Sequence, residues 1–158
     1  MTDNERAKTI RQELKTKLGA SSRDISVTAK DSIRVKIKKE GFSFSDVQEI
    51  AEKQENYERC ERSGEILQGG NTFVFTDFDY TLEKTVEERI CESVENVFNR
   101  FKNDDENSSS SFEIEGVEFA MHKYNHIFIL FQGDRRREFS NSHFSAMNSV
   151  IARMILSK

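Results

Sequence analysis

The stretch ISVTAKDSIRVKI, residues 25–37, decides the fold. Apolar residues alternate with polar ones from position 25 to 29, and the alternation returns from 33 to 37. A period of two is typical of a β-strand with one buried face. The polar residues 30–32 between the two runs are suited to a tight turn, so the stretch predicts a β-hairpin. The polar side of this hairpin carries Arg34, Lys36 and Lys38.

Amphipathic helices are predicted on both sides of the hairpin. Ala7, Ile10, Leu14 and Leu18 recur at helical spacing, which predicts a helix over residues 4–18. Gly19 follows where a helix end favours a left-handed residue. After the hairpin, Ser45 and Gln48 have the spacing of a capping box, and we expect a second helix to begin there.

The remaining chain predicts one more strand, a long helix and a second set of strands. Residues 73–75 form the strand, and a capping box at Thr85 and Glu88 begins a helix that ends near Lys102. The polar run NDDENSSSS predicts a flexible loop over residues 103–111. Further strands are predicted at 112–114, 117–121 and 127–131, the last of them buried on both faces, then a loop over 133–142 and a final helix from Phe144.

This order of elements predicts an α+β fold with a mainly antiparallel sheet and helices packed on one face. Helix–hairpin–helix order occurs at both ends, which suggests an α-β-β-α pseudo-repeat. We expect residues 1–102 to form a helix-hairpin-helix domain with the following strand and helix. The loop 103–111 then leads to a β-β-β-α segment, residues 112–158, that completes the same domain.

Composition indicates a cytoplasmic protein without a membrane span. The 158 residues are 35% hydrophobic and 33% charged, and no apolar run approaches the roughly 18 residues that cross a bilayer. Two cysteines are too few for a disulfide framework, so we expect a reducing compartment.

Charge is unevenly distributed along the chain. The formal charge is +5 over residues 1–40, −13 over 41–120 and +4 over 121–158. Such segregation has two explanations, namely solvated faces that attract one another in the folded chain, or a bipolar surface that binds a charged partner.

The stretch TFVFTDFDYT, residues 72–81, resembles the opening of the haloacid-dehalogenase-type phosphatases. Asp77, Asp79 and Thr81 match the nucleophile, the proton-transferring acid and the threonine of that motif. Such an enzyme also needs later parallel strands that bring Ser or Thr, Lys and further acids to the same edge, and no such units follow. We expect the two aspartates to bond backbone amides near a strand end instead. The sequence therefore predicts no catalytic residues, no metal site and no cofactor.

Basic residues provide one alternative function. Arg34, Lys36 and Lys38 share one strand and its end, and Arg135, Arg136 and Arg137 follow another predicted strand. Patches of this kind bind phosphates, although no aromatic residue interleaves the basic strand. The alternative is a nucleic-acid-binding accessory protein.

The first 75 residues resemble the large polyvalent protein-associated domain family of phages and conjugative elements. The resemblance lies in AKTIRQELK (residues 7–15), ISVTAKDSIRVKI (25–37) and SGEILQGGNTFVF (63–75). The chain lacks the Asp-Gly-Pro turn and the Trp that follow the second strand in that family, and has KKEGFSFSD there. The resemblance implies a mobile-element context and no established chemistry.

The leading hypothesis is a non-enzymatic protein of a phage or mobile element that binds a host protein. By occluding that partner it would inhibit a host defence system, as anti-CRISPR and anti-restriction proteins do. An acidic helix face is the expected contact surface, since it could meet a basic channel. That face consists of Glu87, Glu88, Glu92 and Glu95. A magnesium-dependent phosphatase acting through Asp77 and Asp79 is the least favoured alternative.

Overall fold

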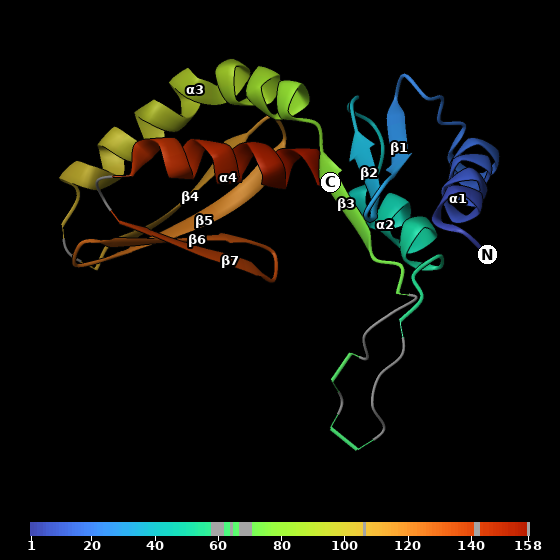
Figure 1. The fold of residues 1–158 in the computed structure, drawn as a ribbon. Coiled ribbons are helices and arrows are strands. Elements are labelled where there is room, and N and C mark those ends of the chain that lie inside the picture. Colours follow the sequence, from blue (N-terminus) through green and yellow to red (C-terminus); the bar gives the residue numbers. More distant parts are fainter. Residues whose placement is uncertain (58–61, 64, 67–70, 106, 141–142, 158) are drawn as a thin grey trace. The chain divides into compact units, whose positions relative to one another are not determined.

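The chain forms two compact units, Met1–Leu82 and Glu83–Lys158 (Figure 1). This computed structural model describes all residues except 58–61, 64, 67–70, 106, 141–142 and 158. The predicted α+β class is confirmed, because four helices accompany a three-stranded and a four-stranded sheet in the described part of the chain. The division falls after Leu82, inside a helix. The sequence had predicted that residues 112–158 complete one domain with residues 1–102 after the loop 103–111.

The N-terminal unit is a small mixed sheet with two helices on one side (Figure 1). The strands lie in the order β1-β2-β3, and β1 and β2 form the predicted antiparallel hairpin, while β3 is parallel to β2. Its elements are α1 (Asp3–Leu18), β1 (Ile25–Ala29), β2 (Ile33–Ile37), α2 (Phe44–Glu52) and β3 (Val74–Phe78).

Local sequence sets the ends of α1. Thr2 and Glu5 form a reciprocal capping box, in which the Glu5 carboxylate accepts from the Thr2 backbone N–H at 2.6 Å. Gly19 ends the helix at φ +66°, a left-handed conformation that costs glycine little. The buried side of α1, with Ala7, Ile10 and Leu14, then packs against β1.

The C-terminal unit is a four-stranded antiparallel meander, in the order β4-β5-β6-β7, with two helices along one face (Figure 1). Phe98 and Phe101 of α3 contact Phe128 of β6 edge-on, and Phe98 also contacts Phe144 of α4. Phe98, Phe101 and Phe128 are buried in the core of this unit. The elements are α3 (Tyr80–Asn103), β4 (Ser109–Ile114), β5 (Val117–Tyr124), β6 (Ile127–Gln132), β7 (Arg135–Ser140) and α4 (Phe144–Leu156).

A buried lysine terminates α3. Lys123 of β5 is only 8% exposed, and its Nζ donates to the backbone carbonyls of Lys102 and Asp104, the former at 3.1 Å. The last carbonyls of a helix lack intrahelical donors and carry partial negative charge. The ammonium group satisfies two such acceptors and so anchors the helix end to the sheet.

Three predicted boundaries are corrected by the structure. The second helix is capped by Ser43, whose Oγ accepts from the Asp46 N–H at 3.3 Å, rather than by Ser45. The third helix begins at Tyr80, so Thr85 lies inside it and is not a cap. Residues 109–111, predicted as loop, belong to β4 because they pair with β5.

Two strand assignments also change. Residues 135–140 form the strand β7 instead of a loop. The C-terminal unit therefore has four strands between α3 and α4, whereas two strands form the hairpin between α1 and α2. In β6, Phe128 and Leu130 are buried while Ile127 is exposed, because only one face of this interior strand is covered by helices. An uninterrupted apolar run had predicted burial on both faces.

The structure describes one of the two cysteines and four helices. Cys91 of α3 is half-buried with a free thiol, and Cys60 and the glycine pair at 69–70 lie outside the described residues. None of the described helices combines the length and the apolar character that crossing a bilayer requires.

A substitution of Phe128 tests how much the core of the C-terminal unit contributes to stability. Phe128→Ala removes a fully buried ring that contacts Phe98 and Phe101, and we expect it to lower the free energy of unfolding by about 3–5 kcal/mol. Urea unfolding followed by circular dichroism measures this loss. Tyr124→Ala, at a residue 59% exposed, is the matched control and should change stability little. Equal effects of the two substitutions would contradict the assigned core.

Candidate nucleic-acid interface

The polar side of β2 carries a row of cations. Arg34 and Lys36 alternate with the buried Ile33, Val35 and Ile37, so they point away from the helices. The backbone N–H of Lys38 donates to the Asp24 carbonyl at 2.7 Å, which continues the hairpin pairing beyond Ile37. Lys38 therefore extends the row, and successive cations are separated by two residues of strand, about 6.6 Å.

Strand β3 places an aromatic ring beside this row. The parallel register pairs Arg34 with Phe75 and Lys36 with Asp77. Phe75 is 53% exposed, and the guanidinium carbon of Arg34 lies 5.7 Å from the centroid of its ring. This cation–π contact orients both side chains on the open face of the sheet. We call Arg34, Lys36, Lys38 and Phe75 together the basic sheet face.

Sequence reasoning missed Phe75 as a member of this face. The basic strand itself contains no aromatic residue. The alternation of residues 73–75 marks Phe75 as facing opposite to the buried Val74, which was an available signal. What the sequence did not supply was the neighbour of that strand, because β3 joins β2 only after the intervening helix and a long connection.

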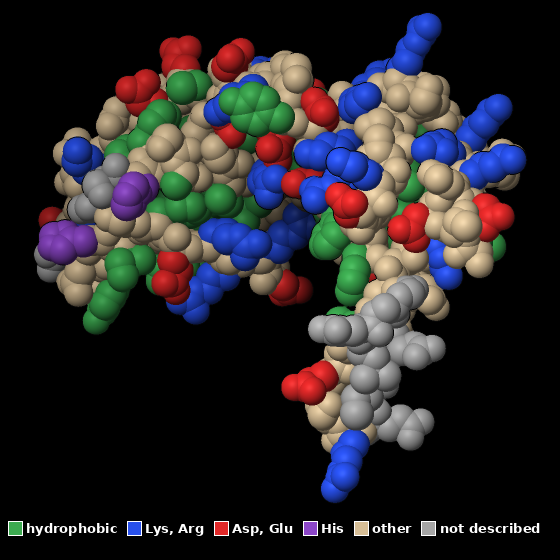
Figure 2. Space-filling view, viewed as in Figure 1, with side chains coloured by type: hydrophobic (Ala, Val, Ile, Leu, Met, Phe, Trp, Pro, Cys, Tyr) green, Lys and Arg blue, Asp and Glu red, His purple; other side chains and the backbone are tan. Residues whose placement is uncertain are grey.

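The basic sheet face is shallow and hollowed beside Phe75. A depression of about 270 Å³ is lined by Arg34, Lys36, Phe75 and Asp77, with Val35 and Thr76 completing it. The strand β1 borders β2 opposite β3, and its small residues Ser26 and Thr28 pair with Lys36 and Arg34. No bulky β1 side chain therefore covers the row of cations. Figure 2 shows Lys and Arg side chains gathered over the N-terminal unit, with Asp and Glu among them.

The second predicted basic cluster is arranged differently. Arg135, Arg136 and Arg137 lie on β7, at the edge of the four-stranded sheet, and all three are exposed. Arg136 forms a salt bridge with Glu138 on the same face of the strand. Because β2 is a central strand and β7 an edge strand of another unit, the two clusters do not occupy equivalent positions.

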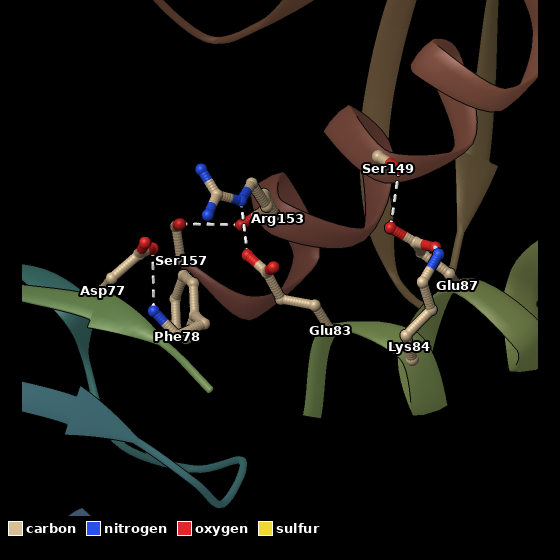
Figure 3. Close-up of polar contacts among 8 residues, drawn as sticks. All are labelled: Asp77, Phe78, Glu83, Lys84, Glu87, Ser149, Arg153 and Ser157. Carbon is tan, nitrogen blue, oxygen red and sulfur yellow. Dashed lines mark hydrogen bonds and ion pairs between the residues drawn. The ribbon is translucent and has the colours of Figure 1, made fainter. Parts of the chain in front are cut away.

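The two aspartates of the phosphatase-like motif have separate local roles. Asp77 lies within β3 rather than beyond its end, and its Oδ1 accepts from the Phe78 N–H at 2.9 Å (Figure 3). The Asp79 Oδ1 accepts from the Thr81 N–H at 3.0 Å in the first turn of α3. Among the residues that the structure describes, no three His, Cys, Asp or Glu side chains are placed to hold a metal ion.

The predicted acidic face of α3 separates into two parts. Glu88, Glu92 and Glu95 are exposed at i, i+4 and i+7, and we call these three residues the acidic stripe. Glu87 points toward α4 instead. Its carboxylate accepts from the Lys84 ammonium and from the Ser149 hydroxyl, each at 2.6 Å (Figure 3).

These contacts change the acidity of Glu87. Partial burial raises the pKa of its carboxyl, but the hydrogen bonds from Lys84 and Ser149 and the charges of Lys84 and Arg153 together outweigh burial. The net result is a pKa below the usual value. Glu87 therefore supports the packing of α3 on α4 and is removed from the candidate partner surface.

No protein-family model matches the chain, and no curated protein or solved structure shows significant similarity to it. The resemblance to the large polyvalent protein-associated domains stays a prediction. Part of the segment that carries it, Gly64 and residues 67–70, lies outside the described residues.

Glu87→Gln tests the α3–α4 contact through its pH dependence. Because folding lowers the pKa of Glu87, its stabilisation is complete above the unfolded pKa of about 4.3 and is lost as pH falls through the folded pKa. At pH near 7 we expect the variant to be less stable by about 0.5–1.5 kcal/mol, with the difference vanishing in acid. Thermal unfolding across pH measures this, and Glu88→Gln is the exposed control. A difference that persists unchanged below the folded pKa would contradict the assignment.

Proposed function

We propose that the chain is a non-enzymatic accessory protein that binds nucleic acid through the basic sheet face. The observation that carries this proposal is the row of Arg34, Lys36 and Lys38 on an open strand face beside the exposed ring of Phe75. Cations with regular spacing suit a repeating polyanion, because each ammonium or guanidinium group can neutralise one phosphate.

The charges of this row are available for a ligand. Within the described part of the chain, no salt bridge engages Arg34, Lys36 or Lys38. The Nζ of Lys39, which follows the row, lies 3.7 Å from the Asp24 Oδ1. Because this ion pair occupies its charge, Lys39 is less suited to phosphate binding. The net charge of −4 does not oppose the proposal, since local potential near a cluster governs encounter with a charged ligand.

The context that fits this function is a phage or conjugative element acting in the cytoplasm. The resemblance of the first 75 residues supports this context. An accessory protein of such an element needs contact with nucleic acid but no chemistry of its own.

Salt dependence of binding tests the proposal. Fluorescence anisotropy with a labelled oligonucleotide should give an affinity that falls roughly 20- to 40-fold between about 50 and 200 mM salt if three phosphates are contacted. Replacing Arg34, Lys36 or Lys38 singly with alanine should each reduce the slope of log affinity against log salt by about 1.

Lys8→Ala is the matched control, because Lys8 is an exposed cation of the same unit on helix α1. It should leave both affinity and slope nearly unchanged. Binding that does not weaken with salt, or that is as sensitive to Lys8→Ala as to Lys36→Ala, would reject the basic sheet face as the contact surface.

A second candidate function is inhibition of a host defence protein by occlusion, with the acidic stripe as the contact surface. Glu88, Glu92 and Glu95 favour it, because all three are exposed on one side of a long, packed helix that would hold them rigidly. A stripe of this kind complements a basic channel in a partner and would speed association with it.

Charge reversal tests this second candidate. The chain is used to capture proteins from host lysate, and the variant carrying Glu88→Lys, Glu92→Lys and Glu95→Lys should lose a basic partner that the unaltered chain retains. Glu113→Lys with Glu118→Lys, at exposed positions of β4 and β5, is the control and should retain it. Equal capture by all three proteins would exclude the acidic stripe.

A further inference from the structure

Phe75 is 53% exposed and does not contribute to the buried core of its unit. Its neighbours in β3, Val74 and Phe78, are buried against the helices, whereas the Phe75 side chain projects to the opposite, open side. Burying so large an apolar ring would stabilise the fold more than leaving it in water, and exposed aromatic residues that lie among cations are characteristic of nucleic-acid contact surfaces.

We propose that the basic sheet face binds single-stranded nucleic acid, with one unpaired base stacked on Phe75 and the flanking phosphates on the cations of β2. The inference rests on the proposed function and specifies its ligand. A base in a duplex has both π-faces covered by its neighbours, so an aromatic ring on a flat sheet cannot stack on it. An unpaired base exposes these faces, and any of the four bases can stack.

The geometry of the site suits this arrangement. The depression beside Phe75, about 270 Å³, leaves open space next to the ring. Arg34 lies over one face of the Phe75 ring, which leaves the opposite face for a base, and its guanidinium can still donate to a phosphate. The phosphate row and the base site are thus adjacent, on neighbouring strands.

The position of Asp77 indicates that the phosphates and the base of the ligand contact different strands. Its carboxylate lies on β3, in register with Lys36, and lines the same depression. A carboxylate repels phosphate, so the phosphates of a ligand are disfavoured beside it. Phosphates are therefore expected along β2 and the base over β3.

The test compares single-stranded DNA, RNA of the same sequence, and the corresponding duplex DNA with the full-length chain. Both single strands should bind more tightly than the duplex, and a preference between DNA and RNA identifies the natural source of the strand. Phe75→Ala should weaken single-strand binding roughly 5- to 150-fold, the equivalent of one stacked base, without changing the salt slope.

Phe75→Leu and Phe75→Trp separate stacking from general apolar contact. Leucine should behave like alanine, and tryptophan should retain affinity. An oligonucleotide containing 2-aminopurine provides a direct readout, because its fluorescence should be quenched by the unaltered chain and not by Phe75→Ala. Circular dichroism should show that all three variants fold, since the side chain is exposed.

The outcomes distinguish this inference from the proposed function. Equal affinity for single strand and duplex, with no effect of Phe75→Ala but a loss with Lys36→Ala, would overturn base stacking and leave phosphate binding intact. Absence of binding to every nucleic acid would overturn both. Retained affinity in Phe75→Leu would also overturn stacking, because leucine has no π-face.

Discussion

The parallel pairing of β3 with β2 is the constraint on which the candidate site depends. Without it, the hairpin would present three cations on one strand and nothing beside them. With it, Phe75 lies against Arg34 and Asp77 lies in register with Lys36. A shift of one residue in this register would turn Phe75 toward the helices and expose Val74 and Phe78. Burial of those two side chains therefore fixes the composition of the open face.

The N-terminal hairpin could be predicted from sequence because its determinants are local. Alternation in residues 25–29 and 33–37, a polar turn between them and Gly19 before them each specify the conformation of nearby backbone. The cations of β2 were found by the same alternation. Phe75 was missed because its significance depends on a pairing between strands that are distant in sequence, and periodicity says nothing about such neighbours.

The errors in the C-terminal unit have a related origin. The run GDRRREFSNS has the composition of a loop, yet pairing with β6 makes residues 135–140 a strand. Tertiary contacts override weak local preference most easily at such positions. Similarly, Thr85 and Glu88 have the spacing of a capping box, but α3 begins earlier, at Tyr80, where Asp79 supplies the capping oxygen. Two competing start signals close together cannot be ranked from sequence alone.

The arginines of β7 have a consequence for the solubility of the unit. An edge strand presents unpaired backbone groups that can recruit a strand from another molecule and extend the sheet between chains. Arg135, Arg136 and Arg137 occupy half of such an edge, and charged side chains on an edge strand disfavour the addition of a further strand. We therefore expect the three arginines to oppose intermolecular sheet growth, an effect that requires charge but no ligand.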